Sequence, residues 1–269
     1  MKVYCNGEII DKDKVSEVFE PGFLFGWGVF EPFRVYGDNI TFLSEHINRL
    51  NMGLEILGIE AIEIDWEKSI RELISTNSIK DAYIRITAYK KRKGTGILIY
   101  ADSFGYYTQE VFEKGFSTLI SSYLRNIDEV ASQVKSLSYL QNRLSWFQAQ
   151  KAKKDEALIL NEKGDLVGGS RSNLFLIKDE RLITPNIESG VFEGITRKVV
   201  LSIAEEMNLE IEEREISLED LATANEAFIT SALLETMPLV ECEDEPIGSG
   251  KPGKITLEIL SEYRKIVKP

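Results

Sequence analysis

The first hundred residues switch between the two-residue period of strands and the 3.6-residue period of helices. Strand-forming residues on either side of Asn6-Gly7 predict a β-hairpin, because this dipeptide suits a tight two-residue turn. Apolar residues three and four positions apart then predict an amphipathic helix from Leu43, with Ser44 as its N-cap. The predicted elements of this part are hairpins over 3–10 and 29–43 and helices over 43–57 and 65–75.

Residues 82–89 alternate strictly between apolar and polar or aromatic side chains. Successive side chains of a strand point to opposite faces, so Tyr83 and Arg85 share one face while the alanine and isoleucine residues share the other. One face of this strand is therefore predicted to pack in a core. The other face is predicted to carry aromatic and cationic groups.

The periodic spacing of apolar residues becomes irregular between residues 103 and 115. This irregular stretch predicts a domain boundary, with a small α+β domain over 1–108 and a larger domain over 109–269. The second part mixes helical and strand-like segments without internal repeats. The predicted fold class is therefore α+β, with two domains around a cleft. The predicted elements of the second part are helices over 139–154, 196–207, 220–224 and 255–267 and strands over 157–161, 173–177 and 226–230.

Composition narrows the classes of function. The 269 residues carry a net charge of −12, which opposes binding to nucleic acid or to anionic membranes. The first residues contain no apolar signal segment, and Cys5 and Cys242 match neither a disulfide framework nor a metal motif, so we expect a cytoplasmic protein without a metal site. Because His46 is the single histidine, chemistry must depend on lysine, tyrosine, carboxylates or a cofactor.

Lys135 is the first candidate for chemistry, because it lies between Val134 and Leu137 just before a predicted helix. A lysine in apolar surroundings loses the hydration that stabilises its ammonium form, so its pKa falls and its amine becomes nucleophilic. Such an amine can form a Schiff base with a carbonyl compound. The alternative interpretation is a lysine whose charged end reaches solvent.

Two segments are candidates for binding an anion. Thr196 opens a predicted helix after Gly194 and Ile195, and free backbone N–H groups at a helix start can bind a phosphate, although ordinary helix capping explains the same residues. Arg49 follows His46 by three positions, so both lie on one side of the helix predicted there. Arg49 could direct a guanidinium at an anion, whereas His46 fits a hydrogen-bonded structural role.

The stretch GDLVGGSRSNLFLI places Gly168 and Gly169 between a turn and an apolar strand. Adjacent glycines at such a point indicate that another group approaches the backbone closely.

These features together resemble one family. The stretches FGWGVFEPFRVY, FLSEHINRL, AYIRITAY, VKSLSYLQN, GGSRSNLFLI, FEGITR and TSALLETMPL occur in this order and are similar to motifs of the fold-type IV pyridoxal-phosphate enzymes. That family includes branched-chain aminotransferases, D-amino acid aminotransferases and aminodeoxychorismate lyases. The resemblance implies their two-domain fold, like that of D-amino acid aminotransferase, with pyridoxal 5'-phosphate in a cleft between the domains, and it implies a homodimer.

The resemblance also implies a role for individual residues. Lys135 would form the Schiff base with the cofactor and later move a proton, and Tyr139 would bond the phenolic oxygen of the cofactor. The residues implied to bind the phosphate are Arg49, Ile195, Thr196, Ser231 and Ala232. The residues implied to pass beside the pyridine ring are Gly168, Gly169 and Ser170. The residues implied to form the substrate pocket are Phe30, Arg34, Tyr83 and Arg85.

The chain departs from the family pattern at Gly168, where the family carries a glutamate that pairs with the protonated ring nitrogen. On this resemblance a Gly168→Glu substitution should raise turnover. Three functions are compatible with the residues. The first is an aminotransferase that exchanges an amino group between a small amino acid, branched-chain-like or D-, and a 2-oxo acid. The second is an aminodeoxychorismate lyase that releases pyruvate and 4-aminobenzoate, and the third is a pyridoxal-phosphate-binding paralogue with weak or altered activity.

Overall fold

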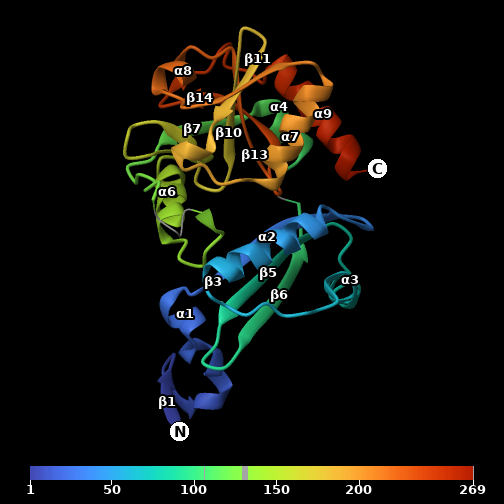
Figure 1. Cartoon of the computed structure of the whole chain (residues 1–269), viewed down its shortest axis with the longest axis vertical. Helices are drawn as coiled ribbons and strands as arrows, with labels where there is room; N and C mark the ends of the chain where they lie inside the picture. The colour runs from blue at the N-terminus through green and yellow to red at the C-terminus, as the bar shows by residue number, and fades with distance from the viewer. Residues whose placement is uncertain (106, 129–132, 269) are drawn as a thin grey trace.

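Besides a two-stranded N-terminal sheet, two larger β-sheets occupy separate halves of the protein in the computed structural model (Figure 1), which describes residues 1–105, 107–128 and 133–268. The smaller sheet has the strand order β4-β3-β5-β6. The larger, nine-stranded sheet has the order β12-β11-β10-β13-β14-β7-β8-β9, with β15 paired to β14. This arrangement confirms the α+β class. The smaller sheet ends at Ser103 and the larger begins at Phe116, so the division after residue 108 stays a prediction compatible with both sheets.

The N-terminal half begins with the predicted hairpin, in which Asn6 and Gly7 both have positive φ. This conformation matches a two-residue hairpin turn and is accessible to asparagine and glycine. The elements of this half are β1 (Lys2–Cys5), β2 (Glu8–Asp11), η1 (Lys12–Phe19), α1 (Pro21–Phe25), β3 (Gly28–Tyr36), β4 (Asn39–Ile40), α2 (Leu43–Ile56), α3 (Trp66–Thr76), β5 (Ala82–Lys90) and β6 (Thr95–Ser103).

Helix α2 packs against β3 through buried residues that include Leu50 and Leu54. The predicted N-cap of this helix is wrong. Phe42 is the N-cap, with a left-handed φ of 52°, and Ser44 lies inside the helix. Because the tight turn after β4 already directs the chain into the helix at Leu43, Ser44 lies two residues after the N-cap position and its hydroxyl does not cap the helix.

The alternation predicted for β5 is confirmed, since its alanine and isoleucine residues are buried and Tyr83 and Arg85 on the opposite face are half-buried. Its neighbour β3 is buried on both faces apart from Pro32. Val29, Phe33 and Val35 of β3 lie in the core of this half. The opposite face of β3, which carries Phe30 and Arg34, is therefore covered by residues outside this core.

The C-terminal half builds its sheet from parallel and antiparallel pairs. Helix α6 connects the parallel strands β7 and β8, and α7 connects the parallel strands β11 and β12. The elements of this half are α4 (Gln109–Lys114), β7 (Phe116–Ile120), α6 (Leu140–Lys151), β8 (Glu156–Leu160), β9 (Leu166–Gly169), β10 (Asn173–Lys178), β11 (Arg181–Pro185), η2 (Ile187–Ser189), α7 (Ile195–Glu206), β12 (Glu210–Arg214), α8 (Leu218–Ala222), β13 (Glu226–Ser231), β14 (Glu235–Cys242), β15 (Glu245–Pro246) and α9 (Lys254–Val267).

A buried cluster of charges joins the two halves at Glu235. This carboxylate accepts hydrogen bonds from Arg34 Nη1 and Tyr36 Oη, both at 3.0 Å, and from Arg264 Nε at 2.5 Å, and it lies 3.1 Å from Lys268 Nζ. Burial opposes the charge of Glu235, but these partners hold its pKa below the usual value. Across the part of the chain that the structure describes, no helix combines the length and the apolar character needed to span a membrane.

Candidate active site

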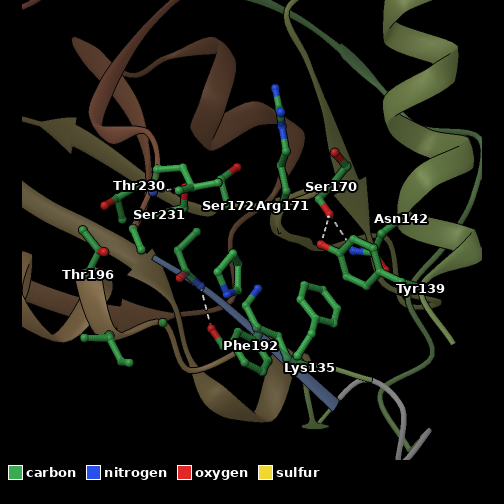
Figure 2. A pocket seen from close by; sticks show the side chains of 18 of the residues that line it. Lys135, Tyr139, Asn142, Ser170, Arg171, Ser172, Phe192, Thr196, Thr230 and Ser231 are labelled. Atoms are coloured by element: carbon green, nitrogen blue, oxygen red, sulfur yellow. Dashed lines mark hydrogen bonds between the residues drawn. The ribbon is translucent and has the colours of Figure 1, made fainter. Parts of the chain in front are cut away.

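A cavity of about 340 Å³ lies between the two halves and is lined by residues from both (Figure 2). It brings together most of the predicted site residues, although they come from segments far apart in the sequence. The predicted residues that line it are Phe30, Arg49, Tyr83, Arg85, Lys135, Tyr139, Gly169, Ser170, Ile195, Thr196, Ser231 and Ala232. Arg34 and Gly168 do not line it.

The segment around Lys135 is held in place by the first residues of β3. Backbone hydrogen bonds run from Phe30 N to Lys135 O at 2.9 Å and from Leu137 N to Gly28 O at 2.8 Å. The Lys135 side chain enters the cavity, where its Nζ lies 5.3 Å from the ring centroid of Phe30 and 5.1 Å from that of Phe192. Burial, reinforced by the positive charge of Arg49, lowers the pKa of Lys135 to about 8. The amine is therefore partly unprotonated near neutral pH and can act as a nucleophile.

Arg49 is oriented by the buried carboxylate of Glu31. Its Nε and Nη2 each donate to Glu31 at 2.7 Å, and its Nη1 donates to Glu193 O at 3.0 Å. His46 Nδ1 bonds the same carboxylate at 2.7 Å, and its ring stacks on Phe33, as the hydrogen-bonded interpretation of this histidine predicts. His46 also lines the cavity. The three bonds of Arg49 leave two of its five guanidinium N–H groups without a partner among the described residues.

The start of α7 fits a phosphate. Its N-cap, Gly194, provides no side-chain hydrogen bond, so the first N–H groups of the helix stay available. The Thr196 hydroxyl is buried at this helix start, beside the hydroxyl of Tyr263. A Cβ at Gly194 would overlap the side chain of Asn173, which shows how closely the backbone is packed here. With Arg49 beside it, this helix start can hold a dianionic group.

Tyr139 forms one side of the cavity together with Asn142. Tyr139 Oη donates to Ser170 O at 2.9 Å, and Asn142 Nδ2 donates to the same carbonyl at 2.7 Å. The edge of the Tyr139 ring meets Phe30 at a centroid distance of 5.1 Å. Burial, and then the charge of Glu156, raises the pKa of Tyr139 to about 12. The phenol therefore remains protonated and acts as a hydrogen-bond donor.

The expectation for Gly168 is corrected by the backbone. Gly168 has a φ of 138°, and a Cβ added to it would lie 2.6 Å from Ser172 O. A glutamate at this position would therefore strain the chain instead of simply supplying a carboxylate. Gly169 does line the cavity, and a Cβ there would overlap Ser172 Oγ and press on Glu156. The close packing predicted at the two glycines thus comes from the protein's own chain as well as from the cavity.

Arg34 does not line the cavity, contrary to what the family resemblance implied. It shares a face of β3 with Phe30 but lies four residues farther along the strand, where it bonds Glu235 and is covered by the rings of Tyr36 and Phe104. Arg85 does reach the cavity, and its guanidinium lies 3.8 Å from the ring centroid of Phe30. The cavity thus keeps one of the two arginines predicted for the substrate pocket.

Sequence reasoning missed several groups around the cavity. Glu31 holds Arg49, Asn142 supports Ser170, and Phe192 packs beside Lys135. A second buried acid, Glu156, lies behind Gly169. A detectable signal existed for Glu31, because it interrupts the apolar strand β3, and an acid buried in that way needs charged or hydrogen-bonding partners. Glu156 is the first residue of β8 and follows two charged residues, so its position gave no such signal.

Proteins named for three activities are similar to this chain over nearly its whole length. A D-alanine aminotransferase of Bacillus licheniformis is 29% identical, covering 99% of this chain and 100% of the relative, and an aminodeoxychorismate lyase of Bacillus subtilis is 31% identical, covering 99% and 94%. The structure of a T.th. branched-chain amino acid aminotransferase with pyridoxamine 5'-phosphate superimposes with a TM-score of 0.87 at 26% identity, covering 99% of this chain and 94% of that one.

The model of the class IV amino-transferase family matches residues 28–242. The matched region runs from the start of β3 to the end of β14 and therefore contains the whole cavity. Enzymes of this family use pyridoxal phosphate, and the cavity has the amine, the phosphate-binding helix start and the aromatic walls that this cofactor requires. The chain belongs to the class IV amino-transferase family of pyridoxal-phosphate enzymes.

Proposed function

We propose that this enzyme is an aminotransferase that moves an amino group between a small amino acid, branched-chain-like or D-, and a 2-oxo acid, with Lys135 as its catalytic amine. The observation that carries the proposal is the Lys135 amine, whose pKa of about 8 leaves it reactive while it faces both a phosphate site and an aromatic wall. When bound, pyridoxal phosphate supplies an aldehyde that condenses with amines and a ring that delocalises the electron pair left at the substrate Cα.

The phosphate would be held on the side of Arg49. The N–H groups of Ile195 and Thr196, the Thr196 hydroxyl and the Ser231 to Ala232 turn line this part of the cavity. Glu31 keeps the Arg49 guanidinium in one orientation, so little side-chain entropy is lost when the anion binds. The hydroxyl of Tyr139 would turn from Ser170 O to the phenolic oxygen of the cofactor.

Lys135 then has two tasks. Its amine would hold the cofactor, and in its free form the same amine would carry a proton from the substrate Cα. A proton carrier works best with a pKa near the working pH, and a pKa of about 8 meets that requirement.

The substrate side of the cavity is formed by Phe30, Tyr83 and Arg85. Aromatic rings favour an apolar side chain, and a single guanidinium over a ring can bind a carboxylate. This combination supports a small amino acid as the substrate. The relatives named as branched-chain and D-alanine aminotransferases motivate testing both stereoisomers.

One observation favours a second candidate, a pyridoxal-phosphate-binding protein with weak or altered activity. Among the described residues that line the cavity, none is an aspartate or a glutamate. An electron-withdrawing pyridinium ring normally depends on an acidic partner, so proton removal from Cα should be slower than in an enzyme that has one.

The proposal is tested by adding pyridoxal phosphate to the purified protein and recording its absorbance, followed by L- and D-amino acids with 2-oxoglutarate. We expect a yellow protein that is bleached by the amino donor and turns over with one stereoisomer. Pyruvate released from aminodeoxychorismate without any 2-oxo acid would instead identify a lyase, and binding without turnover would favour the second candidate.

The role of Lys135 is tested separately by borohydride reduction, which fixes the cofactor to the amine that holds it. Lys135→Ala should lose all covalent labelling, whereas Lys163→Ala, which removes an exposed lysine between β8 and β9, should keep it. Full labelling of Lys135→Ala would overturn the assignment.

A further inference from the structure

The side of the cavity that faces the cofactor's ring nitrogen can be deduced from three fixed points, an inference that rests on the proposed function. In pyridoxal phosphate the ring nitrogen lies para to the carbon that carries the aldehyde, and the phosphate arm and the phenolic oxygen flank that carbon. In Figure 2, Lys135 lies at one side of the cavity, with Thr196 and Tyr139 to the left and right of it. The side across from Lys135 holds Ser172.

This side offers no acid to the ring nitrogen. Glu156 is a buried carboxylate in the adjoining wall, but it lies behind Gly169 and does not line the cavity. Its Oε1 accepts from Ala157 N at 3.0 Å and from the N and Oγ of Ser170. Its Oε2 lies 3.3 Å from Arg171 Nε. Both oxygens of Glu156 are therefore engaged within the wall.

Arg171 is also directed elsewhere. Figure 2 shows its side chain extending away from Lys135, and its guanidinium faces Glu156 and the Trp146 ring, 5.6 Å from the ring centroid. A cation that is paired with a buried carboxylate and packed on an aromatic ring is held in that position. Neither charge of this pair points to the place that the ring nitrogen would take.

The Ser172 hydroxyl remains. Its Oγ is buried and has no hydrogen-bond partner in the described chain, although a buried hydroxyl normally has one. A Cβ at position 169 would overlap this oxygen, so the glycine leaves the space that the hydroxyl occupies, and Ser172 is one of the residues that line the cavity. A hydroxyl can donate to the lone pair of a neutral pyridine nitrogen but cannot stabilise a pyridinium as a carboxylate does.

We propose that Ser172 Oγ donates a hydrogen bond to the ring nitrogen of the bound cofactor and that this nitrogen stays unprotonated. The site then supplies a weaker electron sink than one with an acidic partner, while the orientation of the ring is kept. Gly168 and Gly169 contribute to this arrangement. Gly168 leaves the wall without an acidic side chain, and Gly169 leaves room for the Ser172 hydroxyl.

The experiment is a ¹⁵N NMR measurement on the full-length holoenzyme, reconstituted with pyridoxal phosphate labelled at the ring nitrogen. A pyridinium nitrogen resonates far upfield of a neutral pyridine nitrogen, so the resonance reports protonation directly and independently of turnover. We expect the wild-type resonance in the neutral range throughout the pH range in which the protein is folded. A pyridinium resonance at neutral pH would overturn the proposal.

Ser172→Ala identifies the donor. Loss of the hydrogen bond should move the neutral resonance farther downfield and weaken cofactor binding by about three- to tenfold, as for one neutral hydrogen bond. Ser138→Ala is the matched control, because Ser138 also lines the cavity but bonds Gly26 O. The control should leave the resonance in place, and an unchanged resonance in Ser172→Ala would remove Ser172 from this role.

Two further measurements distinguish a failure of the proposed function from a failure of the inference about Ser172. If borohydride labelling of Lys135 fails in the wild type, the cofactor assignment itself falls. If labelling succeeds but the resonance is that of a pyridinium which becomes neutral in Glu156→Gln, Glu156 is the acidic partner and the inference about Ser172 is wrong. Should Ser172→Ala not fold, the wild-type resonance together with Ser172→Cys, which we expect to shift downfield because a thiol is a weaker donor, decides the question.

Discussion

Glu31 and Arg49 form a doubly hydrogen-bonded ion pair, with both N–H to oxygen contacts at 2.7 Å, at the wall of the cofactor cavity. The same carboxylate bonds His46 Nδ1. Burial alone would raise the pKa of Glu31, but the bonds from Arg49 and His46 lower it below the usual value. Glu31 is therefore charged at neutral pH and fixes the direction in which Arg49 can bind an anion.

Glu31→Gln should weaken both the fold and cofactor binding. Arg49 would lose its charged partner in a buried place, which typically costs about 3 kcal/mol of unfolding free energy. The guanidinium would also lose its fixed orientation, so the dissociation constant of pyridoxal phosphate should rise about tenfold. Chemical denaturation and a cofactor titration measure the two effects. The matched control is Glu67→Gln, whose exposed ion pair with Arg71 should contribute no more than about 1 kcal/mol.

Capture of the cofactor by the apoenzyme should depend on pH with a midpoint near the pKa of Lys135, about 8. Only the unprotonated amine attacks the aldehyde. Since burial lowers the pKa from its usual 10.5, the rate should rise from pH 6 and level off above pH 9. Stopped-flow absorbance measures this rate. A rate that rises without a plateau to pH 10 would show that Lys135 titrates as a solvated lysine.

Gly168→Ala should destabilise the protein. The left-handed φ of 138° and a contact of 2.6 Å between the new Cβ and Ser172 O cannot both be relieved without moving the backbone, and such strain costs about 1–3 kcal/mol. Gly168→Glu should lose stability as well, and we expect no gain in turnover. Thermal unfolding and initial rates of both variants test this. Higher turnover at unchanged stability in Gly168→Glu would contradict the backbone geometry.

Substitution of Arg34 should lower stability, whereas substitution of Arg85 should weaken substrate binding. Arg34→Gln removes a partner of Glu235 from the junction of the two halves and should lower the unfolding free energy by about 2 kcal/mol. Arg85→Gln removes the guanidinium beside Phe30 and should raise the KM of the amino acid by about tenfold or more with little effect on stability. Each variant is the control for the other. A large KM effect in Arg34→Gln alone would return Arg34 to the pocket.

The elements that were predicted correctly have strong local patterns. In β5, α2 and α9 one face is buried, so apolar residues recur with the period of a strand or of a helix. This period is visible in the sequence alone. Strand β12 was not predicted, because its charged residues show no apolar pattern. It exists as an edge strand because β11 provides a parallel partner for its backbone. Local patterns cannot report such pairing.

The candidate site divides in the same way. The motif of Lys135 and the helix start at Thr196 were recognisable by residue type, and both line the cavity. The supporting acids Glu31 and Glu156 were not recognised, because their partners come from other segments of the chain. Their importance depends on burial and on contacts across the fold, which periodicity does not contain.

The sequence by itself determined the family, the two groups of strands and helices, and the inventory of an amine, a helix start for an anion and aromatic side chains. The tertiary structure decided which of these groups meet. The resemblance implied a place in the substrate pocket for both Arg34 and Arg85, but only Arg85 reaches the cavity. Alternation assigns a face of a sheet, whereas the neighbour at each point along a strand is set by packing against residues distant in sequence.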